Sequence, residues 1–323
     1  MKRFKVLFSV VLLLALSVLL QSWGFYAHRR INRMAVFSLP PEMIGFYKSN
    51  IEYLTAHAVD PDKRRYAAKG EAPRHYIDID HYAKDGENPF ETMPRRWRDA
   101  VEKYSEDTLQ AYGIVPWHIA SVTNWLTNAF KEKNAKRILQ LSADLGHYIA
   151  DAHVPLHTTK NYNGQMTGQK GIHGLWESRI PELTADGFDY LVGRAKYIES
   201  PLEAAWKIVE ESHAYVDSVL LIEKALTRSF PTDQKYAFES RGQSTVKQYS
   251  RSFAMAYNNR MGNMVESRMR KAIAMVGNLW YTAWVNAGQP DMDELLLGVD
   301  KEKLRAQEET EKTLSENEHV DCR

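Results

Sequence analysis

The sequence predicts an all-α protein with a single main domain. Helical periodicity recurs along most of the chain, and neither an internal repeat nor a linker divides it. The 323 residues are enough for one large core. Both ends differ in composition from the rest, so we predict a signal peptide at 1–22, a domain at 23–299 and a charged, flexible tail at 300–323.

The N-terminal segment has the composition of a secretory signal peptide. Basic residues at positions 2, 3 and 5 precede an apolar run from Val6 to Leu20, which Gln21 and Ser22 follow. The run is short for a membrane span, which needs about 20 residues. We predict cleavage before Trp23 and a periplasmic or secreted protein. Because Leu20 stands where a small residue is preferred, an uncleaved N-terminal anchor is the alternative.

Charge and cysteine content exclude several classes of site. The chain has 42 basic and 41 acidic residues, and removal of three basic groups with the signal leaves 39 against 41. Such a balance does not predict a large basic surface for nucleic acid, so bound metals must supply positive charge for a phosphate ester. The lone cysteine, Cys322, excludes an intramolecular disulfide and thiolate zinc sites.

Prolines set several limits of the predicted elements. A helix starts near Pro41, and its periodic run at 43–58 ends before Pro61. Residues 59–94 are irregular, and 75–80 alternate like a short strand or an extended loop. Pro155 ends or kinks a helix, and 161–171 forms a loop. The other predicted helices lie at 96–112, 117–131, 135–151, 173–183, 201–228, 232–258 and 263–287.

A cluster of imidazoles and carboxylates predicts a metal site. The cluster reads His147-x3-Asp151-x5-His157, then His173-x3-Glu177. Helical residues four positions apart share a face, so each such pair can close on one ion. This donor set suits zinc, and a site with several such ligands is more typical of catalysis than of structure. We predict surface or core positions for the isolated histidines His57, His81, His118, His153 and His213.

Other catalytic signatures are absent from the sequence. It has no His-Glu-x-x-His pair, no Gly-x-Ser-x-Gly elbow, no Walker phosphate loop and no dinucleotide fingerprint. A serine or cysteine nucleophile therefore has no support. Metal-assisted hydrolysis is the reaction class that remains.

The cluster resembles the core of the trinuclear-zinc phosphoesterases. This superfamily contains the secreted single-strand-specific nucleases of fungi and plants and the bacterial zinc-dependent phospholipases C. Its mature proteins begin with a tryptophan whose terminus binds zinc, and Trp23 follows the predicted cleavage point. His28, five positions later, matches the nuclease branch, and Asp60 and His75 match an aspartate and a histidine about fifteen residues apart.

The resemblance implies a helical fold around a buried cleft that holds three Zn²⁺ ions. Asp151 would bridge two of these ions. The implied ligands are Asp60, His75, His147 and Asp151 for the first ion, His157, His173 and Glu177 for the second, and the Trp23 terminus, His28 and the other oxygen of Asp151 for the third.

The implied chemistry is attack of a zinc-bound hydroxide on phosphorus, with the ions stabilising the developing charge. Asp60 would orient or deprotonate the water, and Lys63 would neutralise a phosphate oxygen. The alternative for Lys63 is a solvated charge within the run Lys63-Arg64-Arg65.

The substrate is the most open part of this interpretation. Tyr76 and Asp78 resemble a nuclease base pocket, in which an aromatic ring stacks on an unpaired base and a carboxylate bonds its edge. Alternatively, both merely pack an extended loop. The spacing from Trp23 to His28 also favours the nuclease branch, whereas Glu177 is the phospholipase choice and the disulfides of the nucleases are missing.

We therefore predict a zinc phosphodiesterase that cleaves single-stranded DNA or RNA to 5′-phosphate products, with 3′-nucleotidase activity as a possible addition. A phospholipase C acting on phospholipid is the first alternative. A non-catalytic, zinc-stabilised binding protein is the second. No stable protein partner is predicted.

Overall fold

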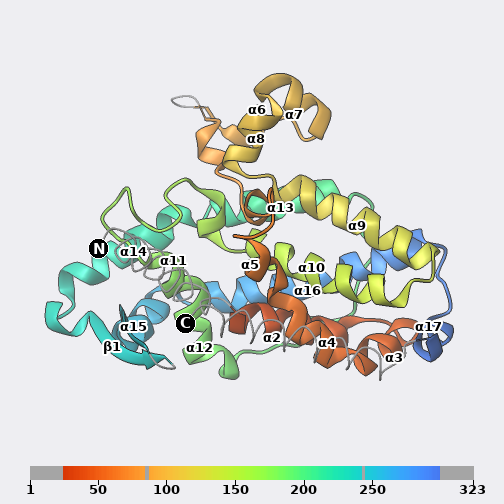
Figure 1. The fold of residues 1–323 in the computed structure, drawn as a ribbon. Helices are drawn as coiled ribbons and strands as arrows, with labels where there is room; N and C mark the ends of the chain where they lie inside the picture. Colours follow the sequence, from red (N-terminus) through yellow and green to blue (C-terminus); the bar gives the residue numbers. More distant parts are fainter. Residues whose placement is uncertain (1–24, 84–86, 242–243, 299–323) are drawn as a thin grey trace, which may run out of the picture.

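The computed structural model describes residues 25–83, 87–241 and 244–298, which form a largely helical domain (Figure 1). The predicted all-α fold class is confirmed. The predicted signal peptide at 1–22, Trp23 and the predicted tail at 300–323 lie outside the described residues. The α-helices are α2 (Phe25–Ala35), α3 (Pro41–Ser49), α4 (Ile51–Ala56), α5 (Asp60–Arg64), α6 (Pro89–Thr92), α7 (Trp97–Tyr104), α8 (Glu106–Tyr112), α9 (Val115–Lys131), α10 (Ala135–Ala152), α11 (Ile172–Gly174), α12 (Ile180–Thr184), α13 (Pro201–His213), α14 (Val216–Ser229), α15 (Arg251–Met261), α16 (Met264–Asn286) and α17 (Met292–Gly298).

Shorter elements connect these helices. One of them, η6 (Leu175–Arg179), is a π-helix within the predicted helix at 173–183. The 3₁₀-helices are η1 (Val36–Ser38), η2 (His57–Val59), η3 (Ala72–His75), η4 (Ile79–His81), η5 (Pro155–Thr158), η7 (Ala185–Gly187) and η8 (Thr232–Gln234). None of the helices in the described part of the chain is long and apolar enough to cross a membrane.

The predicted helix at 232–258 is wrong. Its first half forms an antiparallel hairpin of β1 (Tyr236–Arg241) and β2 (Ser244–Tyr249), with Tyr236 opposite Tyr249. Side chains from 235 to 240 alternate between half-buried and exposed positions, a period of two that a helix cannot produce. Only the second half is helical, as α15.

Three other predicted helices are each divided in two. The run at 43–58 breaks at Asn50, whose side-chain amide donates to the Phe46 carbonyl oxygen at 2.8 Å. The run at 96–112 breaks at Ser105, which has a φ of 69° and caps α8 through a bond from the Thr108 amide to its hydroxyl. The run at 201–228 turns at 214–215, between α13 and α14.

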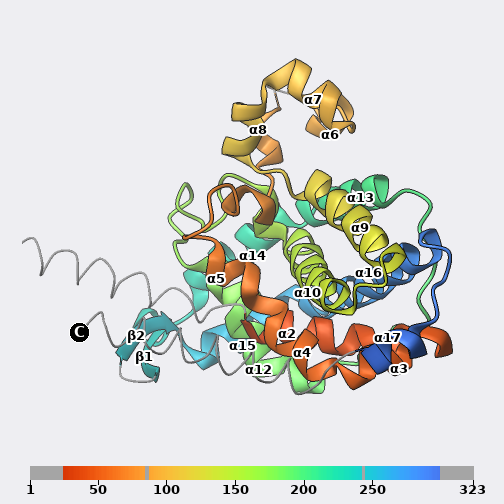
Figure 2. The same cartoon turned by 45° about the vertical axis from the view of Figure 1, so that its right-hand side comes forward.

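Helix α10 is the centre of the core. Every residue from Leu141 to Ala152 is buried, because α9, α16 and α2 surround this helix (Figure 2). In both views α6, α7 and α8 project away from this body. The most enclosed helix thus carries His147 and Asp151, so the predicted metal ligands lie inside the core.

A close crossing of α2 and α10 brings distant parts of the chain together. Gly146 faces Asn32, whose side-chain amide donates to the carbonyl oxygens of Ala143 at 3.0 Å and Leu54 at 3.4 Å. The missing Cβ of Gly146 permits this approach. As a result, the ring of His28 on α2 stacks on that of His147, with centroids 4.1 Å apart.

A buried arginine anchors the end of α10. Arg268 on α16 is 1% exposed, and its guanidinium donates to the carbonyl oxygens of His153 at 3.0 Å and Ile208 at 3.3 Å. His153 itself is buried, and burial holds its pKa well below the ordinary value. These contacts confirm that His153 is a core residue, as predicted.

Candidate metal centre

The two predicted ligands on α10 face each other as their four-residue spacing requires. The Nε2 atom of His147 lies 3.2 Å from Oδ2 of Asp151, and both residues are buried. His147 donates from Nδ1 to the Ala58 carbonyl oxygen at 2.9 Å, which leaves the Nε2 lone pair directed at the carboxylate. Such anchoring of the second ring nitrogen is typical of histidines that bind metals.

His75 completes the first group of donors. It ends η3, and its Nδ1 atom lies 2.9 Å from Oδ2 of Asp151 and 3.1 Å from Nε2 of His147. Donor atoms of the three residues lie within 4.8 Å of one another. Three of the four ligands expected for the first ion therefore come together.

The fourth expected ligand, Asp60, is not part of this group. Its carboxylate bonds Nδ1 of His57 at 2.5 Å and Nζ of Lys63 at 2.8 Å. Although burial would raise the pKa of Asp60, those two neighbours outweigh it and the pKa lies below its ordinary value. Asp60 belongs to none of the four donor groups found among the described residues.

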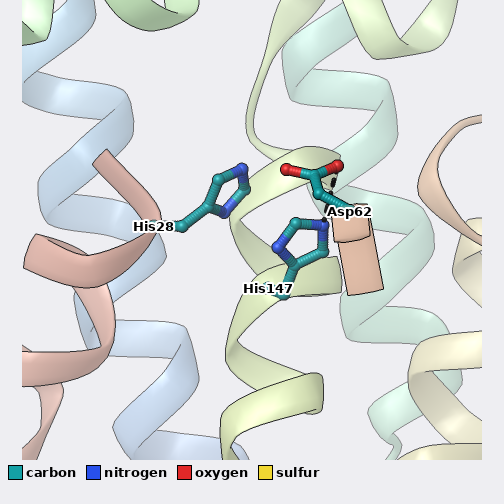
Figure 3. A group of neighbouring side chains, drawn as sticks. All are labelled: His28, Asp62 and His147. Atoms are coloured by element: carbon teal, nitrogen blue, oxygen red, sulfur yellow. Dashed lines mark ion pairs between the residues drawn. The ribbon is translucent and has the colours of Figure 1, made fainter. Parts of the chain in front are cut away.

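Asp62 occupies the position expected for Asp60. Its Oδ1 atom lies 3.6 Å from Nε2 of His147 and 3.8 Å from Nδ1 of His75. Figure 3 shows this carboxylate and the ring of His28 converging beside the ring of His147, and donor atoms of the three residues lie within 4.8 Å of one another. Helical residues two positions apart face different directions, so α5 cannot direct Asp60 and Asp62 to the same point. Asp62 lies in the same Asp-Pro-Asp run as Asp60, and the spacing to His75 alone does not single it out.

The second group contains all three predicted ligands. Oε2 of Glu177 lies 2.7 Å from Nε2 of His173 and 3.4 Å from Nε2 of His157. The Nδ1 atom of His157 donates to the His75 carbonyl oxygen at 2.7 Å, and that of His173 donates to the Tyr162 carbonyl oxygen at 3.1 Å. As predicted, the α10 helix ends before Pro155 and His157 follows the break.

His28 lies between the two carboxylates and forms a third group. Its Nε2 atom is 3.3 Å from Oδ1 of Asp151 and 3.3 Å from Oε1 of Glu177. Asp151 therefore presents one oxygen to the first group and the other to the third, the arrangement expected of a bridging carboxylate. Glu177 likewise presents its two oxygens to the second and third groups, an arrangement that was not among the predictions from sequence.

The electrostatics of the cluster keep its carboxylates ionised. Burial alone would raise the pKa values of Asp151 and Glu177, but the surrounding imidazoles hold both well below their ordinary range. Conversely, burial would lower the pKa values of His75 and His147, yet nearby carboxylates raise both.

The residues present fit zinc. Imidazole nitrogens held by carbonyl anchors converge on two buried carboxylates, which is the donor set that zinc prefers when thiolates are absent. His28 differs from these three histidines, because its Nε2 atom faces the carboxylates while its Nδ1 atom is buried without a hydrogen-bond partner among the described residues.

The predicted base pocket lies on the extended segment after His75. Tyr76 is half-buried, with a φ of −150°, and its hydroxyl donates to the Ala111 carbonyl oxygen at 3.4 Å. Asp78 is half-buried, and burial together with the charge of Asp80 raises its pKa to about 7. The predicted strand or extended loop at 75–80 is only partly correct: residues 76–78 lie between the 3₁₀-helices η3 and η4, and no strand forms in this range.

Fold and site together define a helical protein whose buried imidazoles and carboxylates form neighbouring groups that could hold metal ions. The family described as zinc-dependent phospholipase C matches residues 27–240, and the chain belongs to this family. Nuclease S1 from Aspergillus oryzae (strain ATCC 42149 / RIB 40) is 25% identical over 198 residues, which are 56% of this chain and 62% of that protein. The expected resemblance is thereby confirmed.

Solved structures with some similarity include two clostridial toxins. The alpha-toxin of Clostridium perfringens from avian strain SWCP gives a TM-score of 0.45 at 12% identity, covering 84% of this chain and 65% of that chain. The alpha toxin of Clostridium absonum gives 0.41 at 10% identity, covering 80% and 64%. The chain thus spans less than two thirds of the length of each of these relatives.

Proposed function

We propose that the protein is a zinc-dependent phosphodiesterase that cleaves single-stranded DNA or RNA and leaves 5′-phosphates. The observation that carries this proposal is the convergence of three donor groups on the two oxygens of Asp151 and the two of Glu177. Similarity to nuclease S1 favours nucleic acid as the substrate. Removal of 3′-phosphates is a second activity to be tested.

We assign one zinc ion to each of the three donor groups described above. The first ion would take His75, His147 and Asp151, with Asp62 as the carboxylate from α5 instead of Asp60. The second ion would take His157, His173 and Glu177, and the third would take His28 and the free oxygens of the two bridging carboxylates. The terminus of Trp23 is proposed as a further ligand of the third ion.

When bound, zinc supplies Lewis acidity and activates water near neutral pH. The chain's own residues supply position and charge. His147, His157 and His173 are held by carbonyl oxygens, so their Nε2 atoms are oriented before any ion binds. Tyr76 would stack on an unpaired base, and Asp78 would bond the edge of that base.

Phospholipase C activity is the alternative enzyme. The description of the family names this activity, and Glu177 stands where the resemblance leads us to expect an aspartate in the nucleases. The site does not distinguish the two, because both substrates are phosphodiesters.

Parallel assays test the proposal. Zinc content is measured, and purified protein is incubated with single-stranded DNA, duplex DNA, RNA and phosphatidylcholine before and after chelation. We expect cleavage of single strands that stops on chelation and returns with zinc. Release of phosphocholine without any cleavage of nucleic acid would favour the phospholipase. Bound zinc with no hydrolysis would favour the binding protein.

N-terminal sequencing of the exported protein tests the localisation and the third ion together. We expect a mature terminus at Trp23. A terminus elsewhere would remove the proposed terminal ligand from the site.

A further inference from the structure

A pocket of about 280 Å³ lies where α7, α9 and α13 meet. The described residues that line it include no proposed metal ligand and neither Tyr76 nor Asp78. Both views show α7 in the part of the chain that projects from the body, with α9 and α13 in the body beneath it (Figures 1 and 2). The pocket therefore forms where the projecting helices join the core, and it is distinct from the metal centre.

Tryptophans from two helices form the apolar wall of this pocket. The rings of Trp97 and Trp117 meet edge to face, with centroids 5.3 Å apart, and Leu202 adds an aliphatic surface. The indole N–H of Trp117 donates to the Arg95 carbonyl oxygen at 2.7 Å, and its ring packs edge to face on Trp206 at 4.9 Å. Because these contacts fix Trp117, the wall is formed before any ligand binds, which lowers the entropic cost of binding.

Helix α9 supplies the polar side of the pocket. His118, Ser121 and Asn124 follow one another at intervals of three residues, so they lie along one side of the helix. The Ser121 hydroxyl donates to the Trp117 carbonyl oxygen at 2.9 Å, which leaves the lone pairs of its oxygen for a ligand. Among the described residues that line the pocket, none is an acid, a lysine or an arginine. A phosphate group would find no opposite charge here, so an uncharged ligand fits better.

The imidazole of His118 is buried but unpaired. It is 6% exposed and forms neither a hydrogen bond nor an ion pair with any residue in the described ranges. The rings of Trp125 and Tyr148 lie nearly perpendicular to it, with centroids 5.8 Å and 4.5 Å away. Burial and the charge of Arg74 lower the pKa of His118 to about 3, so the ring is neutral near pH 7 and one nitrogen keeps its lone pair. A buried polar group of this kind ordinarily has a hydrogen-bond partner.

We propose that this pocket binds an uncharged aromatic molecule whose N–H or O–H group donates a hydrogen bond to His118. The rings of Trp97 and Trp117 favour a planar aromatic ligand, and the free lone pairs along α9 favour a ligand with a donor. An apolar cavity of roughly 150 Å³ holds benzene, so a pocket of about 280 Å³ has room for a bicyclic ring such as indole. The site does not depend on the phosphodiesterase activity proposed above.

Two isomeric probes, 3-methylindole and 1-methylindole, test the hydrogen bond because they have the same size and only the first keeps its N–H. Each is titrated into the zinc-loaded protein and followed by ligand-observed NMR. We expect 3-methylindole to bind with a Kd of about 1 mM or below. The 1-methyl isomer should bind about fivefold more weakly, because one neutral hydrogen bond is lost. A single-stranded oligonucleotide should displace neither probe.

Variants locate the binding. His118→Phe keeps a ring but removes both nitrogens, so the two probes should bind this variant equally well. Ser121→Phe places a large side chain in the pocket and should abolish binding of both probes. The control is Asn128→Phe, an exposed position on the same helix that does not line the pocket, and it should change neither affinity. Zinc content and unfolding temperature are measured for each variant.

Three results would overturn the proposal. These are no saturable binding of 3-methylindole to the wild type, equal affinities for the two isomers, and binding that survives Ser121→Phe in a folded protein. Displacement of the probe by the oligonucleotide would place it in the substrate cleft and would also overturn a separate site. If His118→Phe does not fold, the isomer pair on the wild type and Ser121→Phe still decide the question. The nuclease proposal is unaffected by any of these outcomes, since it is tested by cleavage.

Discussion

Substitution of Gly146 by alanine should open the metal centre by forcing α2 and α10 apart. A Cβ at this position would lie 1.8 Å from Oδ1 and 2.7 Å from Cγ of Asn32, whereas ordinary contacts begin near 3.4 Å. Asn32 is fully buried and its amide bonds the carbonyl oxygens of Ala143 and Leu54, so its side chain has nowhere to move. The crossing must therefore widen by roughly 1.5 Å or these bonds must break.

The expected change in the free energy of unfolding for Gly146→Ala is the sum of opposing contributions. Overpacking of a core costs about 1–3 kcal/mol, and loss of the asparagine hydrogen bonds adds about 1 kcal/mol. The better helix propensity of alanine offsets about 1 kcal/mol. We expect a net loss of about 2 kcal/mol in the free energy of unfolding. His28 would also move from Asp151, now 3.3 Å away, by more than the roughly 0.5 Å that a binding site tolerates.

Thermal unfolding with and without chelator, together with zinc content by mass spectrometry, measures both effects. We expect Gly146→Ala to unfold at a lower temperature and to lose zinc from the group that contains His28. The control is Gly45→Ala on α3, because a Cβ there meets nothing within 4 Å. This exposed helical change should raise stability by up to about 1 kcal/mol. A Gly146→Ala protein with unchanged unfolding temperature and full zinc content would refute the reasoning.

Three further predictions concern the carboxylates. Asp151→Asn should lose two of the three proposed ions in a zinc assay, because its two oxygens face different donor groups; full occupancy would contradict the bridging role. Asp62→Asn should lower zinc content more than Asp60→Asn, and the reverse order would restore Asp60 as the ligand. The pKa of Asp78 is raised to about 7, above the value of about 4 for an unfolded chain. The native state therefore binds the proton of this carboxyl more tightly than the unfolded chain does. The contribution of Asp78 to the free energy of unfolding thus falls as the pH rises from about 4 to 7. Denaturant titrations at pH 5 and 8 should therefore show Asp78→Asn gaining stability over the wild type at the higher pH, and a pH-independent difference would argue against the shift.

Local features of the chain were predictable from sequence because they depend on neighbours a few residues apart. The four-residue spacing of His147 and Asp151 on a helix leads directly to the 3.2 Å approach of their side chains. Pro155 cannot continue a helix, so the end of α10 could be placed before it.

The β1–β2 hairpin was not predicted because it depends on contacts between two segments and not on local neighbours. Residues 232–258 contain enough helix-forming residues to suggest a helix, and the alternation along β1 is short. Pairing with β2 then determined the conformation, and pairing is a contact between two segments rather than a property of either one.

Sequence alone determined the donor types, their pairing along helices and the family. The tertiary structure decided which donors meet. Asp62 rather than Asp60 lies near His147 because α5 has one orientation relative to α10, and residues two apart cannot share it. Glu177 joins His28 to the second donor group because α2 crosses α10 closely at Gly146. Such contacts depend on the angle and distance at which helices pack, and no spacing within the chain specifies these.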